Sequence, residues 1–181
     1  MDGLNDFLNW AWARHANPMS WYIRPLFILP FCYFAYRRSL WGMALTIVAV
    51  TSSMFWFPAP ATPDPRAAAF LAVERQYVAG PWTLSRIVLT ALVPIWFVAL
   101  AWGVRRRSWL GVATVIGSGT LLKVGWSFYS GGESAWVIVP PVALGLVICA
   151  SVLLFASRRV GHGPGGPDPR SHPKRSVSNI V

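Results

Sequence analysis

Three cationic residues lie inside apolar stretches of this chain, and their positions suggest a binding chemistry. Arg24, Arg86 and Lys123 each stand three or four residues from a tryptophan; the tryptophans are Trp21, Trp82 and Trp126. A charge inside a bilayer is costly unless it has a partner, a route to water or a function. At about 1.5 Å per helical residue, all three cations are expected roughly 5–9 Å below one membrane edge. A shared depth on three segments predicts a polar pocket for an anionic group.

Two carboxylates and a small polar helix face accompany these cations. Glu133 follows Lys123 and Glu74 precedes Arg86, so a purely structural interpretation would pair Lys123 with Glu133 and Arg86 with Glu74. Three cations against two carboxylates leave room for an anionic ligand. Thr120 and Ser127 share a helical face with Lys123. The predicted ligand-binding set is Lys123, Arg86, Arg24, Glu133, Glu74, Trp126, Trp82, Ser127 and Thr120. The alternative is that the cations are anchors that reach the headgroups and form purely structural ion pairs.

The sequence contains no pattern typical of a metal, haem or nucleotide site. Of the three histidines only His15 can approach the membrane, so we expect no metal ion and no cofactor. Cys32 and Cys149 lie inside apolar runs and are interpreted as small buried hydrophobic residues. An acid or base for catalysis would have to be Glu133 or Glu74. We therefore expect a non-enzymatic protein more than an enzyme.

Composition identifies the environment in which these residues act. The chain has 181 residues, of which 55% are hydrophobic and 12% charged, whereas about a quarter of a soluble domain is charged. The apolar residues form long runs, which indicates transmembrane helices. The predicted fold class is all-α, a multi-pass transmembrane helical bundle formed by a single domain over residues 1–159. The general character is that of small multi-pass proteins of bacterial inner membranes, which is a class and not a family.

The predicted elements are transmembrane helices, surface helices and a tail. About five spans are expected, at 19–36, 39–57, 82–104, 108–130 and 135–156. Two amphipathic interfacial helices are expected at 2–15 and 66–79, the second capped by Asp64 and Pro65. On the second helix, Glu74 is expected to face water or headgroups. Residues 160–181 are rich in Gly, Pro and Ser, and are predicted to be a disordered cytoplasmic tail.

Charge distribution predicts the orientation in the membrane. The formal net charge is +10, and arginine clusters follow the apolar runs at 37–38, 105–107 and 158–159. The positive-inside rule places these clusters and the C-terminus in the cytoplasm, and an odd number of spans places the N-terminus outside. We therefore expect a multi-pass protein of the inner (plasma) membrane. Such clusters attract anionic lipid, so no nucleic-acid partner is expected.

The two arginine-containing turns resemble each other in sequence. Arg38-Ser39-Leu40-Trp41-Gly42 is echoed by Arg107-Ser108-Trp109-Leu110-Gly111, and a surface helix and a span precede each. This pattern is that of a parallel repeat, as some transporters have. The alternative is that inward hairpins in general look alike.

The first hypothesis is a binding or assembly component with an outward-facing polar pocket. Its expected partners are the lipid bilayer itself, and in the pocket an anionic lipid headgroup or a polar segment of another membrane protein. The second hypothesis is a small transporter or channel subunit with Lys123 lining the path, which would need to form oligomers. A membrane-embedded enzyme is the third.

Overall fold

The computed structural model describes residues 2–161, and every element in this range is helical, with no strand. The predicted all-α class is therefore confirmed. The last helix, α8, spans Val139–Gly161, so it includes the first two residues of the predicted tail. The rest of that tail lies outside the described residues.

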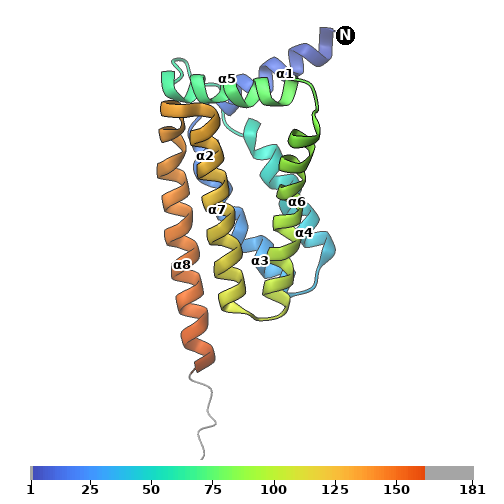
Figure 1. Cartoon of the computed structure of the whole chain (residues 1–181), viewed down its shortest axis with the longest axis vertical. Helices are drawn as coiled ribbons and strands as arrows, with labels where there is room; N and C mark the ends of the chain where they lie inside the picture. Colours follow the sequence, from blue (N-terminus) through green and yellow to red (C-terminus); the bar gives the residue numbers. More distant parts are fainter. Residues whose placement is uncertain (1, 162–181) are drawn as a thin grey trace, which may run out of the picture.

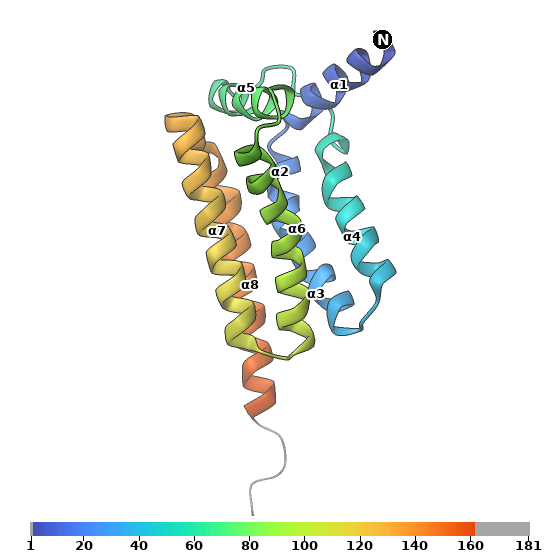
Figure 2. The ribbon, with the colours of Figure 1, turned by 45° about the vertical axis from the view of Figure 1, so that its right-hand side comes forward.

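Two helices lie across one end of the bundle. They are α1 (Asp2–His15) and α5 (Pro65–Ala79), and both views show them roughly perpendicular to the long helices (Figures 1 and 2). The helices predicted at 2–15 and 66–79 are thus present. Arg75 of α5 donates to the side-chain oxygen of Asn9 at 2.7 Å, which ties the two helices together.

The start of α5 follows the predicted capping pattern. The Asp64 carboxylate accepts hydrogen bonds from the backbone N–H groups of Arg66 at 2.7 Å and Ala67 at 3.2 Å. Pro65 occupies the first helical position, where its missing N–H has no partner to lose. This cap fixes the residue at which α5 begins.

The other segments run lengthwise beneath these two helices (Figure 2). The first lengthwise segment consists of three short helices, because the prolines at 25 and 30 interrupt what would otherwise be a continuous α-helix. In chain order the lengthwise segments are α2 (Met19–Ile23), η1 (Arg24–Phe27) and α3 (Ile28–Tyr36); α4 (Leu40–Ser52) and η2 (Ser53–Phe55); α6 (Leu84–Arg105); α7 (Trp109–Gly131); and η3 (Gly132–Ile138) with α8.

Two helical stretches of the described chain are long and apolar enough to cross a membrane, judged by length and composition alone. They are Leu84–Arg105, with 22 residues, and Trp109–Phe155, with 47 residues. The longer stretch comprises α7, η3 and α8, which lie side by side after a reversal at Gly132, whose φ is 53° (Figure 1). Leu40–Phe55 is apolar but shorter. The predicted count of five spans is not supported by this criterion, because α3 has 9 residues and α4 has 13, whereas a spanning helix needs about 20.

The turn between α3 and α4 places an arginine in the left-handed region. Arg38 has a φ of 56°. The N–H of Ser39 donates to the carbonyl of Phe34 at 2.9 Å, and the N–H of Arg38 to that of Ala35 at 3.1 Å. These two bonds make a Schellman motif, in which glycine is the usual residue at the left-handed position. The Ser39 hydroxyl then caps α4 by accepting from the N–H of Gly42.

The turn between α6 and α7 has the same conformation. Arg107 has a φ of 54°, the N–H of Ser108 donates to the carbonyl of Gly103 at 3.1 Å, and the Ser108 hydroxyl caps α7 through the N–H of Gly111 at 3.1 Å. The sequence echo therefore corresponds to two equivalent turns. Arg107 also donates to the hydroxyl of Tyr36 at 3.2 Å, which links the second turn to the end of α3.

We predict that Arg38→Gly stabilises the protein by about 0.5–1 kcal/mol, because glycine adopts a positive φ without a Cβ clash. Arg37→Gly is the matched control, since it removes the same charge from the neighbouring residue, whose φ is −72°. Thermal unfolding in detergent, followed by far-UV circular dichroism, should show a higher midpoint for the first variant only. Equal midpoints for the two variants would contradict the prediction.

Candidate functional site

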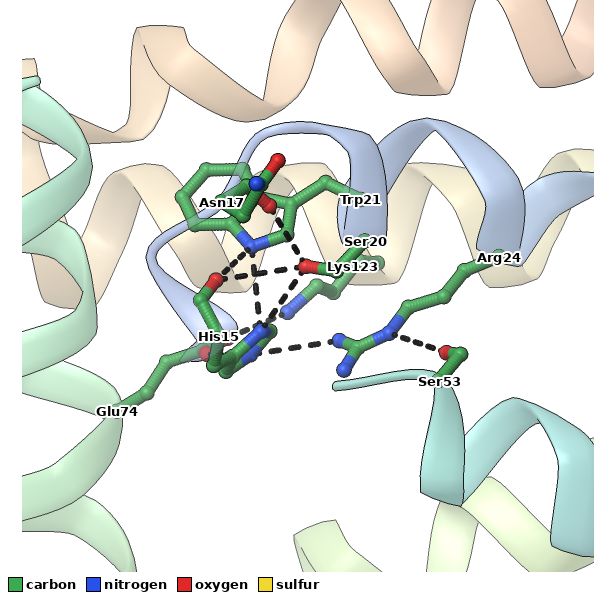
Figure 3. A network of polar contacts seen from close by, with 8 residues as sticks. All are labelled: His15, Asn17, Ser20, Trp21, Arg24, Ser53, Glu74 and Lys123. Atoms are coloured by element: carbon green, nitrogen blue, oxygen red, sulfur yellow. Dashed lines mark hydrogen bonds and ion pairs between the residues drawn. The ribbon is translucent and has the colours of Figure 1, made fainter. Parts of the chain in front are cut away.

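A cleft of about 230 Å³ lies beneath α5, where α1, α2, α7 and α8 converge. Four of its lining residues carry ionisable side chains: His15, Arg24, Glu74 and Lys123. Figure 3 shows that these side chains point toward one another from four different segments. The rest of the lining is largely apolar and consists of Trp21, Pro25, Phe70, Ile138, Pro141 and Val142. The cleft thus combines a polar cluster with apolar walls.

The turn between α1 and α2 brings His15 and Trp21 together. The N–H of Asn17 donates to the carbonyl of Arg14 at 3.1 Å, and the N–H of Ser20 donates to the carbonyl of Asn17 at 3.1 Å. The chain therefore changes direction directly after His15, and the Trp21 indole N–H donates to the His15 carbonyl at 2.9 Å. His15 is 4% exposed. The last residue of a surface helix is in this way buried beside the first residues of a lengthwise one.

The neighbours of the His15 ring favour one tautomer. Nδ1 lies 3.3 Å from the indole nitrogen of Trp21, which can only donate. The Ser20 hydroxyl, which can donate or accept, lies at the same 3.3 Å from Nδ1. With Nδ1 as the acceptor of the Trp21 N–H, the proton of the neutral ring is on Nε2. Nε2 lies 3.8 Å from the Glu74 carboxylate and 3.5 Å from Nη1 of Arg24. Since Arg24 also only donates, the Nε2 proton is directed to Glu74, and the approach of Arg24 is a contact between two donors.

Glu74 is shared by two partners in the cleft. One of its oxygens lies 3.1 Å from the Lys123 ammonium, and the other faces His15. Burial alone would raise the pKa of Glu74, but the hydrogen bond from His15 and the positive charge of Lys123 lower it to about 2. The Lys123 ammonium also lies 5.6 Å from the centre of the Phe70 ring, within the range of a cation–π contact.

The same surroundings keep His15 uncharged. Burial lowers the pKa of His15 below its ordinary value of 6.5, and the charges of Arg24 and Lys123 lower it further, against the opposing effect of Glu74. At neutral pH the cleft therefore holds two cations, one carboxylate and a neutral imidazole. It has one positive charge in excess.

Arg24 carries this excess charge. Its Nε lies 3.4 Å from the Ser53 hydroxyl. Among residues 3–155, whose side chains the structure describes, the ion pairs within 4.0 Å all involve Glu74, and Arg24 is in none of them. A half-buried guanidinium without a carboxylate retains several free N–H donors directed at the cleft. Such a group can receive an anionic ligand.

Both ion pairs of the purely structural alternative, Lys123–Glu133 and Arg86–Glu74, are wrong. Lys123 pairs with Glu74, and Glu133 lies exposed on η3 outside the cleft lining. Arg86 instead donates to the backbone carbonyl of Tyr77 at 2.9 Å, and its guanidinium stacks over the Tyr77 ring at 5.2 Å. Helix α5 turns Glu74 toward the bundle, and not toward water as expected, which places it near α7 and away from the start of α6.

The remaining predicted residues lie outside the cleft lining. The Trp82 residue is 54% exposed, and the Trp126 ring packs edge-on against Tyr77 at 5.8 Å. Thr120 is half-buried on α7. Ser127 is 1% exposed, and its hydroxyl has no hydrogen-bond partner. The structure therefore brings together Arg24, Glu74 and Lys123 from the predicted set.

Comparison of the chain with protein-family models, curated proteins and solved structures finds no match. Function is therefore inferred from the geometry and charge of the cleft. Among the described residues, no group of three His, Cys, Asp or Glu side chains could hold a metal ion.

Sequence reasoning missed the central position of His15. The periodicity of α1 placed it on an apolar arc facing lipid, whereas Ala11 and His15 of that arc are buried and Leu4 and Phe7 are exposed. The signal available was Asn17-Pro18, two residues after His15, a pair typical of a turn. A turn there redirects the chain and brings the end of α1 against the start of α2.

We predict that stability falls in acid, in two ranges of pH. The pKa of folded His15 is depressed, so unfolded chains bind a proton below pH 6.5 while folded chains do not, and stability falls as the pH drops below 6.5. The pKa of Glu74 is lowered from 4.5 to about 2, so its contribution is present above pH 4.5 and is lost as the pH falls from 4.5 toward 2.

Glu74→Gln should abolish the loss of stability between pH 4.5 and 2, and should destabilise the protein at pH 7. The pKa shift of Glu74 corresponds to about 3 kcal/mol of folding free energy. Solvent screening at the half-exposed Lys123 reduces the loss of stability expected in the variant to about 1–2 kcal/mol. Unfolding midpoints at pH 7, 5 and 3 in a non-ionic detergent measure both effects. Glu133→Gln is the control, because this carboxylate lies outside the cleft. The pairing is refuted if the two variants have the same pH profile.

Proposed function

We propose that this chain is a multi-pass membrane protein that binds an anionic group, from a lipid headgroup or from a polar segment of a partner, in an outward-facing cleft. The observation that supports this most is Arg24, a half-buried guanidinium for which the described bundle supplies no carboxylate within 4.0 Å. Burial of an uncompensated charge is costly, and an anionic ligand would offset that cost. The protein would act by binding and not by catalysis.

The outer surface of the lengthwise helices favours a bilayer environment. Large apolar side chains are exposed along α4, α6 and α7, as for Trp41 at 82%, Val98 at 70% and Leu110 at 80%. In this proposal all the lengthwise segments cross the membrane, which makes five spans. Leu40–Phe55 is about 24 Å long at 1.5 Å per residue, and the bilayer thins locally to accommodate such a short segment.

The distribution of charge favours the orientation in which the cleft faces outward. The turns at Arg37–Arg38 and Arg105–Arg107 lie at the end of the bundle opposite α1 and α5 (Figure 1). Glu74 and the cap residue Asp64 belong to α5. The positive-inside rule then places the arginine turns in the cytoplasm and the cleft on the other side.

A transporter or channel subunit is the second candidate, and the two equivalent turns favour it. Each follows a surface helix and a descending segment, which is the arrangement of a parallel repeat. Lys123, whose side chain is 54% exposed, would line the path in this case. The chain would also need to form oligomers, because five spans are few for a transporter.

We predict that cysteines at Gly3 and Ala59 are labelled from outside the cell and a cysteine at Arg106 only from inside. The parent protein would carry alanine in place of Cys32 and Cys149. A membrane-impermeant maleimide on intact cells, compared with permeabilised cells, makes the measurement. Labelling of all three positions from the same side would refute the five-span orientation.

We also predict that the purified protein retains an anionic molecule, and that Lys123→Met retains at least several-fold less of it, because Lys123 contributes one of the two cations. Native mass spectrometry of protein extracted in a mild detergent measures the bound mass. Arg86→Met is the control, since Arg86 is already bonded to the carbonyl of Tyr77.

Two results would contradict the binding proposal. One is that neither the wild type nor Lys123→Met retains any anionic species. The other is that wild-type proteoliposomes pass chloride or phosphate and Lys123→Met abolishes this flux, which would favour the transporter.

A further inference from the structure

We infer that the ligand of the cleft is a phospholipid with a net charge of −1, whose phosphate lies between Arg24 and Lys123. This inference rests on the proposed function, because it names the ligand class of the same cleft. Charge balance, donor geometry and the apolar walls support it in turn.

Charge balance selects a ligand with a single negative charge. The ionisable groups that line the cleft are His15 from α1, Arg24 from η1, Glu74 from α5 and Lys123 from α7. The lining residues from η3 and α8 are Ile138, Pro141 and Val142, which carry no charge. With His15 neutral, the excess is one positive charge. A phosphodiester with an uncharged headgroup has a charge of −1 and neutralises this excess. A choline or ethanolamine headgroup is itself positive, so such a lipid has no net charge and leaves the excess in place.

The donors around the cleft suit a phosphate. The guanidinium of Arg24 uses its Nε toward Ser53 and keeps its terminal N–H groups for a second acceptor. Figure 3 shows that the Lys123 ammonium and the Arg24 guanidinium both point toward His15 from different segments. A tetrahedral phosphate presents oxygens in several directions and can accept from both cations, and arginine binds phosphate through two parallel bonds.

The walls of the cleft suit the apolar part of the same molecule. Phe70, Pro141 and Val142 lie beside the polar cluster. Further along, Pro25 packs so closely on Gly145 that a Cβ there would overlap the proline ring, which closes the path between η1 and α8. The Lys123 side chain is 54% exposed, so the cleft is open on the side of α7. Acyl chains can therefore leave the cleft sideways along α7.

In the test, the full-length protein is kept in a non-ionic detergent and mixed with equimolar phosphatidylglycerol, phosphatidylcholine and oleate. Native mass spectrometry then counts the molecules of each that are bound. We expect preferential binding of phosphatidylglycerol, about tenfold weaker binding in Arg24→Gln, and several-fold stronger binding in Glu74→Gln, which removes the competing carboxylate. Arg86→Gln removes an equal charge outside the cleft and should bind like the wild type. Glycerol 3-phosphate should displace the lipid from the wild type, which tests the site even where Arg24→Gln does not fold.

The outcomes separate this inference from the proposed function. If oleate binds as well as phosphatidylglycerol and Arg24→Gln weakens both, the cleft is an anion site and the phosphate class is wrong. If Arg24→Gln and Arg86→Gln weaken binding equally, the lipid is held by overall charge and the inference is overturned. If no anionic lipid binds better than phosphatidylcholine and the extracted protein carries no other anion, both the inference and the proposed function fail.

Discussion

The ion pair between Glu74 and Lys123 is the contact on which the end of the bundle beneath α1 and α5 depends. Glu74 belongs to α5, and its partners Lys123 and His15 belong to α7 and α1, so one carboxylate holds three segments together. Apolar packing adjoins this contact, because Trp21, Phe70, Ala135 and Ile138 form a buried cluster beneath α5. Without that carboxylate, two cations would face each other in a partly buried space, at a substantial electrostatic cost. The position of α5 across the bundle is thus set by charge as well as by apolar contact.

Close backbone approach determines the rest of the architecture. The Trp96 indole donates to the carbonyl of Val115 at 2.8 Å and lies where a Cβ of Gly119 would be. This contact joins α6 to α7 in their cytoplasmic halves in the proposed orientation, and a second apolar cluster that includes Phe31, Leu100 and Cys149 surrounds that level. The bundle therefore has two separate apolar clusters, one beside the cleft and one nearer the arginine turns.

Local patterns predicted the helices well, and long-range pairing was predicted only in part. The Asp64 cap, both surface helices and the two equivalent turns depend on residues within a few positions of each other, so their spacing is informative. The pairing of Glu74 depends on the rotation of α5, and no local pattern contains that rotation. Proximity in sequence then suggested Arg86 as its partner, which the fold does not provide. Arg24 and Lys123 both line the cleft, whereas Arg86, which the same count along the helices places at the same depth, does not.

The contrast between Arg24 and Arg86 shows what makes a buried cation available to a ligand. Both follow a tryptophan by three or four residues, and the sequence treats them alike. Arg86 lies against the end of α5, where the carbonyl and ring of Tyr77 satisfy its guanidinium. The polar contacts of Arg24 are with the Ser53 hydroxyl at 3.4 Å and His15 Nε2 at 3.5 Å, so its guanidinium has few acceptors. The supply of acceptors around a cation, more than its depth in the membrane, therefore decides whether it anchors the protein or binds a ligand.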